Sequence, residues 1–333
     1  MDTSNPGRTN APASAGLLFI LDPLAQLKPA KDSSIAMLRE CARRGIAVFA
    51  CTPHDLVWEQ GSVRARVQAL QIAAPPAAHW MTAQAAGTRP LAGFAAVLMR
   101  KDPPFDSEYL YATHLLGAAQ REGARVFNSP EALRNHNEKL AITEFAQFTA
   151  PTLVSADPAE ILQFQAVHGQ IVVKPLDGMG GTGIFRLAPG DPNTNVILET
   201  ATLEGARTVM AQRFLPQISD GDKRILLIDG AVVPYALARI PKPGESRGNL
   251  AAGGTGRAQP LSARDREIAE ALGPMLAARG LLLVGLDVIG DCLTEINVTS
   301  PTCFVEIREQ SGFDVAAAFV DALLARLERP QAW

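Results

Sequence analysis

The segment most informative about the fold is residues 171–187, which read Ile-Val-Val-Lys-Pro-Leu-Asp-Gly-Met-Gly-Gly-Thr-Gly-Ile-Phe-Arg-Leu. An apolar strand that ends at Lys174 enters a run of glycines, and an alternating segment, 184–187, leaves it. The letters match the dinucleotide pattern G-x-G-x-x-G, but that pattern needs a helix after the loop, and here a strand and Pro189 follow. A Walker A loop is excluded too, because no lysine follows the last glycine.

A strand, a glycine loop and a second strand can lay backbone N–H groups over phosphates, as the glycine loop of kinases does. Lys174 directly precedes this loop and favours the phosphate interpretation. The alternative is a plain hairpin tip without a ligand. The segment therefore predicts a flap over phosphates.

A second informative unit is residues 281–298, where oxygen-bearing side chains interrupt an apolar hairpin. Glu295 and Asn297 are two residues apart and share one face of a strand. A three-residue turn would place Asp287 opposite Glu295, whereas a two-residue turn, Gly290-Asp291, would point it away. Carboxylate and amide oxygens suit Mg²⁺, so the metal hypothesis predicts the longer turn. The alternative, a solvated polar face, is disfavoured by the apolar neighbours.

Basic residues and glycines dominate the stretch from Arg239 to Arg257, which also holds Lys242 and Arg247 against one acid, Glu245. This composition predicts a mobile loop that closes over an anionic reaction centre, or a solvated loop without a role. Further upstream, Arg224 enters a strand that faces the same region.

Outward from these units, the apolar pattern predicts an α/β chain with a domain boundary near residue 130. A β-α-β rhythm in the first part implies a parallel sheet, while residues 60–93 carry no clear pattern. The expected first-domain elements are strands at 17–22, 46–51, 95–99 and 124–128, and helices at 33–44 and 106–122. The second domain is expected to hold helices at 130–147, 263–279 and 313–328, and strands at 171–174, 184–187, 209–214, 223–228 and 232–239.

The amino-acid composition excludes several classes of protein. The chain has 333 residues, enough for about two domains, and its 47% hydrophobic and 20% charged residues are typical of globular proteins. The 31 basic and 34 acidic residues give a charge of −3, which argues against a general nucleic-acid coat. Cysteines without C-x-x-C spacing indicate a reduced, cytoplasmic protein. The apolar runs are too short for a membrane span, and residues 1–15 are expected to be a disordered leader.

Lys139, Lys174 before the flap, and the metal hairpin together resemble the ATP-grasp ligases. Longer strings, in order from about residue 17 to 327, resemble the prokaryotic-type glutathione synthetase family. They include Met99-Arg100-Lys101-Asp102-Pro103-Pro104, Asn137-Glu138-Lys139-Leu140, Arg247-Gly248-Asn249-Leu250 and Thr294-Glu295-Ile296-Asn297-Val298-Thr299-Ser300.

This resemblance implies an ATP-grasp fold with an N-terminal Rossmann-like parallel-sheet domain, the pre-ATP-grasp domain, over 16–129. The ATP-grasp domain would span 130–328, with the glycine flap at 176–184, the lid at 241–257 and the metal hairpin at 281–298. The implied activity is ATP-dependent ligation of γ-glutamylcysteine and glycine through an acyl phosphate. The products would be glutathione, ADP and phosphate.

The resemblance also implies roles for individual residues. Catalytic roles fall to Arg224, Arg239, Arg247, Asn249 and Gly254. Nucleotide contacts fall to Lys139, Lys174, Asp177, Gly178, Met179, Gly180, Gly181, Gln212, Phe214, Leu215 and Asp222. Magnesium ligands would be Asp287, Glu295 and Asn297, with Mn²⁺ as a substitute. The segments 31–34 and 100–102 would help to bind the peptide substrate.

The implied partners are the two small-molecule substrates and further copies of the chain in a homo-oligomer, expected to be a tetramer, with no nucleic acid and no membrane. Two other functions stay open at this level. One is a different carboxylate–amine ligase of the same fold, such as an enzyme that joins D-alanines or extends a peptide end. The other is a nucleotide-binding regulatory protein without turnover.

Overall fold

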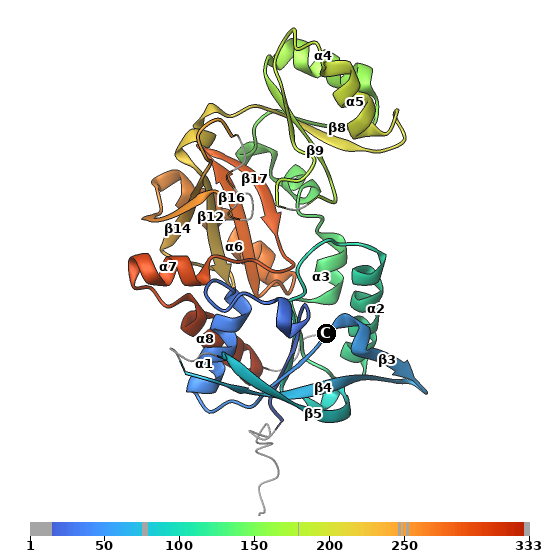
Figure 1. Cartoon of the computed structure of the whole chain (residues 1–333), viewed down its shortest axis with the longest axis vertical. Helices are drawn as coiled ribbons and strands as arrows, with labels where there is room; N and C mark the ends of the chain where they lie inside the picture. The colour runs from blue at the N-terminus through green and yellow to red at the C-terminus, as the bar shows by residue number, and fades with distance from the viewer. Residues whose placement is uncertain are drawn as a thin grey trace, which may run out of the picture.

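The computed structural model describes residues 15–74, 79–178, 180–245, 248, 250 and 253–329. Three β-sheets follow one another along the long axis of the molecule (Figure 1). A seven-stranded sheet lies at one end, a small four-stranded sheet at the other, and a six-stranded sheet between them. This mixed α/β arrangement is the fold class that the sequence predicts.

The first sheet contains the predicted parallel strands, in the order β3-β4-β2-β1-β6-β7, with β5 paired to β4. Its strands are β1 (Leu17–Ile20), β2 (Val48–Cys51), β3 (Leu56–Glu59), β4 (Ser62–Ile72), β5 (Met81–Pro90), β6 (Ala96–Met99) and β7 (Val126–Phe127). Strands β4 and β5 occupy the stretch without a clear pattern. Strand β5 is mostly exposed and rich in Ala, Thr and Gln, so apolar alternation does not reveal it.

Helices α1 (Ser33–Arg43) and α2 (Ser107–Arg121) confirm two predicted helices, and the Asp32 carboxylate caps α1. The prediction of a single helix over 130–147 is wrong. The chain instead forms α3 (Pro130–Asn135) and a 3₁₀ segment, η4 (Leu140–Phe148). Between them, Oδ1 of Asn137 accepts hydrogen bonds from the backbone amides of Lys139 and Leu140. Such a side-chain bond competes with the helical hydrogen-bond pattern, so Lys139 lies in a turn.

The small sheet has the order β10-β9-β11-β8 and carries the glycine flap between β9 and β10. Its strands are β8 (Thr152–Ser155), β9 (Ile171–Pro175), β10 (Phe185–Leu187) and β11 (Val209–Arg213). Strands β9, β10 and β11 confirm the predictions around the flap, and β8 was not predicted. Helices α4 (Pro158–His168) and α5 (Thr194–Thr202) lie at the same end of the molecule and were not predicted (Figure 1).

The six-stranded sheet has the order β15-β14-β12-β16-β17, with β13 paired to β12. Its strands are β12 (Asp222–Ile228), β13 (Ala231–Val232), β14 (Tyr235–Ile240), β15 (Thr255–Pro260), β16 (Leu283–Ile289) and β17 (Cys292–Asn297). The predicted hairpin at Asp229-Gly230 is confirmed, and both turn residues have positive φ, 50° and 80°. The sequence is completed by α6 (Ala263–Ala278), α7 (Phe304–Ser311) and α8 (Val315–Glu328), together with the 3₁₀ turns η1 (Leu24–Gln26), η2 (Pro53–Asp55), η3 (Leu91–Gly93) and η5 (Pro216–Asp220).

The turn of the β16–β17 hairpin corrects the register prediction. Ile289 pairs with Cys292, so the turn has two residues, not three. A β-bulge follows, and beyond it Asp287 pairs with Glu295 after all. The bulge supplies the extra residue that the longer turn was expected to supply, so the two acids face each other as the metal hypothesis requires.

The expected lid also has different bounds. Residues 255–257 belong to strand β15, and Arg239 lies in β14 and is buried, so the connecting loop spans 241–254. Two residues expected to act from this loop, Arg247 and Asn249, lie outside the described residues, as do Met179 of the flap and most of the leader, 1–14.

The C-terminal helices return to the first sheet. Helix α8 lies beside α1 (Figure 1), and the Arg44 guanidinium is 2.5 Å from the carboxylate of Asp321. One apolar cluster joins Phe319 of α8 to Leu38 of α1. Across the described ranges, no helix combines the length and apolar character needed to span a bilayer.

Candidate active site

A cavity of about 680 Å³ lies where the three sheets approach one another. Its lining draws on the glycine flap, on strands β9, β12, β16 and β17, and on loops of the first domain. Most residues that the family resemblance selects line it. They are Lys139, Lys174, Gly178, Gly180, Gly181, Gln212, Phe214, Leu215, Asp222, Arg224, Arg239, Asp287, Glu295 and Asn297.

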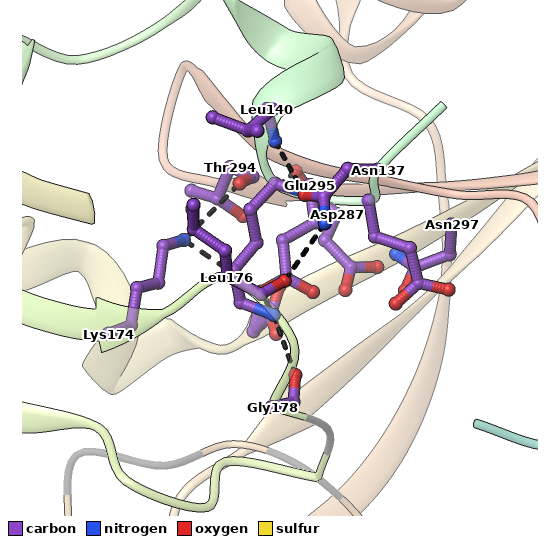
Figure 2. Close-up of polar contacts among 12 residues, drawn as sticks. Asn137, Leu140, Lys174, Leu176, Gly178, Asp287, Thr294, Glu295 and Asn297 are labelled. Carbon is purple, nitrogen blue, oxygen red and sulfur yellow. Dashed lines mark hydrogen bonds and ion pairs between the residues drawn. The ribbon is translucent and has the colours of Figure 1, made fainter. Parts of the chain in front are cut away.

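Two buried lysines converge on one carboxylate in this cavity. Figure 2 shows one of them, Lys174, with Glu295. The Nζ atoms of Lys139 and Lys174 lie 3.6 and 3.8 Å from Oε1 of Glu295. Lys174 reaches from β9 and donates to the Thr294 carbonyl at 3.3 Å, and Lys139 donates to the Gly178 carbonyl of the flap at 2.7 Å. The two ammonium groups outnumber the carboxylate, so this part of the cavity is suited to an anion such as a polyphosphate.

The position of Lys139 depends on the turn before η4. Asn137 accepts from two amides of the turn and donates to the Leu176 carbonyl at 3.2 Å. The Glu138 carbonyl accepts from the amide of Ile296 at 2.8 Å and ties the turn to β17. Lys139 is therefore held between the flap and the metal hairpin.

Burial lowers the pKa of Lys174, and the Glu295 carboxylate opposes that change. A desolvated ammonium gains more from a bound phosphate than a solvated one does, because little water remains to compete. The electrostatics thus favour an anionic ligand at Lys174.

The three expected metal ligands face one another across the hairpin (Figure 2). Glu295 lies opposite Asp287 on β16, and Asn297 lies two residues further along β17. The Asn297 side-chain nitrogen donates to the Gly285 carbonyl at 3.3 Å, so its oxygen is the atom left for a ligand. Two carboxylates and an amide oxygen form a donor set that fits Mg²⁺ when phosphate oxygens complete the shell.

Asp287 also belongs to a buried cluster with two arginines. Arg224 Nε lies 2.5 Å from Asp287 Oδ1, and Arg239 Nη2 lies 2.9 Å from Oδ2 and contacts Asp222 as well. Burial raises the pKa of Asp222 despite the nearby Arg239 charge. At Asp287 burial acts in the same direction, but the two guanidinium groups outweigh it and hold the pKa below its ordinary value. The two arginines therefore hold Asp287 in its anionic form.

The flap is built on glycines for a steric reason. A Cβ atom on Gly178 would lie 2.8 Å from the Pro175 ring and 3.1 Å from the Thr182 carbonyl.

Asp177 does not line the cavity; its exposed carboxylate pairs with Arg207 at 2.8 Å. The structure thus separates Asp177 from the other nucleotide residues that the resemblance selects.

The segment from Gln212 to Leu215 forms another wall, with the Arg186 guanidinium stacked 4.1 Å from the centre of the Phe214 ring. The amides of Arg213 and Phe214 donate to the Pro151 and Gln170 carbonyls. Hydrogen bonds from this segment to a ligand must therefore come from its other backbone groups.

Sequence reasoning selected Phe214 and Leu215 but missed other apolar residues of the lining, among them Val172, Ile184, Ile218 and Ile289. For two of these residues, the alternation of side chains along a strand could have predicted a place in the site. Val172 shares a strand face with Lys174, and Ile289 is two residues from Asp287, so each lies beside a predicted site residue. Apolar side chains on opposite sheets are suited to a flat ring such as a nucleobase.

At the far end, the cavity is lined by Lys31, Asp32 and Asp102, three members of the expected peptide-binding segments. Arg100 is buried behind them, where it donates to Ser34 Oγ at 3.2 Å and to the Pro301 carbonyl at 2.9 Å. Among the further polar residues in the lining, Glu138 and Thr299 belong to strings that carry the resemblance but received no role, and Glu306 lies outside those strings.

The described part of the lid approaches the arginine cluster closely. A Cβ atom on Gly248 would lie 2.2 Å from the Arg239 carbonyl, so only glycine fits there. Gly254 lies behind this layer, where a Cβ atom would be 2.3 Å from the Gly248 carbonyl, and it does not line the cavity. Gly254 therefore shapes the loop from outside the cavity.

Comparisons with known proteins identify the family. The family model described as the prokaryotic glutathione synthetase N-terminal domain matches residues 16–134, and the model of the ATP-grasp domain of the same family matches residues 138–312. A glutathione synthetase from Nitrosomonas europaea is 59% identical over 315 residues, which cover 94% of this chain and 98% of the relative. A glutathione synthetase from Bordetella parapertussis is 60% identical over 311 residues, covering 92% and 98%.

Two solved structures share the fold at 18% identity. D-cycloserine synthetase DcsG has a TM-score of 0.66 and covers 94% of this chain and 100% of its own. The ATP-grasp ligase PsnB, in a complex with a minimal precursor, Mg and ADP, has a TM-score of 0.60 and covers 95% and 99%. The two family models follow each other along the chain and the relatives match nearly all of it, so the chain belongs to the prokaryotic glutathione synthetase family of ATP-grasp ligases.

Proposed function

We propose that this chain joins γ-glutamylcysteine to glycine with ATP, through an acyl phosphate, and releases glutathione, ADP and phosphate. The observation that carries the proposal is the shared cavity. It brings two buried lysines, an acidic hairpin and two buried arginines to one place, next to an apolar pocket on one side and polar loops on the other.

The roles follow from chemistry and position. The apolar residues and the segment 212–215 would hold adenine, and Lys139 and Lys174 would hold the α- and β-phosphates. Asp287, Glu295 and Asn297 would hold Mg²⁺, which screens the phosphate charge when bound; Mn²⁺ would substitute with the same oxygen ligands.

Arg224 and Arg239 would act at the reacting carboxylate. In the structure their charges are directed at Asp287 and Asp222. A cation on Asp287 would weaken these ion pairs and free the guanidinium groups to stabilise the transferring phosphoryl group and the tetrahedral oxyanion. One such preorganised donor is worth about 3–4 kcal/mol of barrier.

The organisation of the chain is part of the proposal. Residues 16–129 would shape the peptide side and residues 130–328 the nucleotide side, in a cytoplasmic homotetramer. Light scattering of the purified protein tests the assembly, because a monomer at micromolar concentration would contradict it.

ADP release tests the activity. Protein, ATP, Mg²⁺ and γ-glutamylcysteine are mixed, and ADP is measured with and without glycine. Glycine-dependent ADP together with glutathione supports the proposal. ADP that depends on another amino acid or peptide end would replace it with a different carboxylate–amine ligase. ATP binding without turnover on any acceptor would support a regulatory protein.

A further inference from the structure

Glu306 has one carboxylate oxygen without a hydrogen-bond partner among the described residues. Glu306 lies in the first turn of α7 and lines the cavity. Its Oε2 atom is buried, and no described residue offers it a hydrogen bond. Burial raises the pKa of this carboxyl group, while its own amide and Lys31 oppose the rise. A buried, unpaired acceptor of this kind is costly unless a ligand satisfies it.

The neighbouring acids differ from Glu306 because the protein already uses them. Asp22 pairs with Lys101 at 2.8 Å and accepts from the amide of Asp102 at 2.9 Å. Asp32 accepts from the amide of Ile35 at the start of α1. A cation that enters this end of the cavity therefore finds its best unfilled acceptor at Glu306.

A positive side chain lies on the same part of the lining. Lys31, just before α1, lines the cavity, is exposed, and acts electrostatically on Glu306. A carboxylate and an ammonium group in the lining of one cavity match a ligand that presents an ammonium and a carboxylate on one carbon atom, which is an α-amino acid head group.

Glu306 also lies beyond the reacting centre. Cys303, at the start of α7, and Glu306, three residues further along, line the cavity together with Arg224 and Arg239. Cys303 has a left-handed conformation, φ 86°, which turns the chain into α7. The lining thus runs from the two arginines past Cys303 to Glu306, and a ligand whose reacting carboxylate faces the arginines can direct its opposite end to Glu306.

We propose that Glu306 binds the α-ammonium group, and Lys31 the α-carboxylate, of the γ-glutamyl head of the peptide substrate. This inference rests on the proposed function. A γ-linkage leaves both groups free, whereas an α-linked glutamyl peptide has only the ammonium group free at that carbon. Glycine also carries both groups, but its amine must be unprotonated and free to attack, so it is not the group held by Glu306. The pair is a specificity determinant for γ-linked peptides.

The test compares three peptide substrates. γ-Glutamylcysteine carries both groups, glutarylcysteine lacks the ammonium group, and 4-aminobutanoylcysteine lacks the carboxylate. Glu306→Gln is expected to raise the KM for γ-glutamylcysteine roughly 30- to 100-fold, with the KM for ATP and glycine unchanged. It should also remove most of the preference over glutarylcysteine. Lys31→Met should instead remove the preference over 4-aminobutanoylcysteine.

Glu131→Gln, on an exposed site of α3 outside the cavity, is the matched control and should behave as the unaltered chain. ADP binding by calorimetry reports whether each variant is folded, and Lys31→Met carries the test if Glu306→Gln does not fold. Unchanged peptide KM values, or a raised KM for glycine alone, would overturn the inference. The unaltered chain separates the two proposals: if it makes no glutathione, the proposed function fails, whatever the variants do.

Discussion

At the scale of single residues, the site is a set of buried charges that compensate one another only in part. Asp287 is matched by Arg224 and Arg239, but Lys139 and Lys174 share one carboxylate, Glu295. Unmatched buried charge costs folding free energy, and proteins retain it where a ligand supplies the missing charge. The excess of ammonium groups therefore marks the expected phosphate position more specifically than the glycine loop alone.

Replacing one of these lysines separates activity from stability. Lys174→Ala is expected to lower ATP turnover roughly 100- to 1,000-fold, because a positioned cation at the phosphates is lost. The free energy of unfolding should stay the same or rise, since a desolvated ammonium is removed. Turnover assays and thermal melts of both proteins measure this. Near-normal turnover in a folded variant would remove Lys174 from the phosphate site.

The metal assignment has its own test. Glu295→Gln is expected to raise the Mg²⁺ concentration for half-maximal activity at least roughly tenfold, because a neutral amide binds Mg²⁺ more weakly than a carboxylate. Asp291→Asn, at the exposed turn of the same hairpin, is the control and should leave the titration unchanged. An unchanged titration for Glu295→Gln would contradict the ligand role.

At the scale of elements, small local features decide which side chains meet. The bulge between the β16–β17 turn and Glu295 reverses the facing that a two-residue turn alone would impose. The side chain of Asn137 ends a helix that the apolar spacing would have continued, and it places Lys139 in the site. Both features move a charged residue from an irrelevant face into the cavity.

Helix α6 packs on the β12–β13 turn through two glycines, and this contact can be tested. A Cβ atom on Gly273 would lie 2.3 Å from the Gly230 carbonyl. Gly273 also precedes Pro274, and a side chain at that position clashes with the proline ring when the backbone is helical. Gly273→Ala should therefore destabilise by about 2 kcal/mol, although alanine is the better helix former by about 1 kcal/mol.

Gly117→Ala in α2 is the matched control, because its Cβ would have no neighbour closer than 3.7 Å. It should stabilise the protein by about 0.5–1 kcal/mol. Urea unfolding of both variants gives the two values. A stable Gly273→Ala protein would mean that α6 shifts freely on the sheet.

At the scale of the whole molecule, the last helix returns to the first domain, so the two ends of the chain stabilise each other. Helix α1 carries Glu40, buried between Arg43 and Arg44, and Arg44 extends the network to Asp321 of α8. The hydrogen bond from Arg43 lowers the pKa of Glu40 to about 2; burial opposes this change and Arg44 supports it.

This network makes part of the stability pH-dependent. A carboxyl group with a pKa depressed in the folded state stabilises the protein above its unfolded pKa of about 4.3 and loses that contribution as the pH falls toward 2. Glu40→Gln should lower the free energy of unfolding by about 1–2 kcal/mol at pH 7, discounted for the exposed Arg43, and by much less at pH 3. Exposed Glu131→Gln is the control. A Glu40→Gln difference that does not shrink on acidification would contradict this coupling.

Much of the architecture could be predicted because its signals are local. The strand–glycine–strand unit, the Asp229-Gly230 turn and the caps at Asp32 and Ser129 each depend on neighbouring residues. Strand β5 could not be predicted, because it is mostly exposed and carries little apolar patterning. Strand β4 does alternate, with Val63, Ala65 and Val67 buried, but the signal is weak because one of its inward residues is the small Ala65. The apolar cavity residues were missed because their faces matter only once two sheets oppose each other.

The sequence by itself determined the family, the α/β fold class and most of the charged residues that meet in the cavity, since motif spacing sets which side chains share a strand face. Tertiary structure alone decided the register that pairs Asp287 with Glu295, the separation of Asp177 from the cavity, and the unpartnered Oε2 of Glu306. The physical reason is distance along the chain. A hydrogen bond or ion pair between residues far apart in sequence exists only after packing brings their elements together, and no local spacing encodes it.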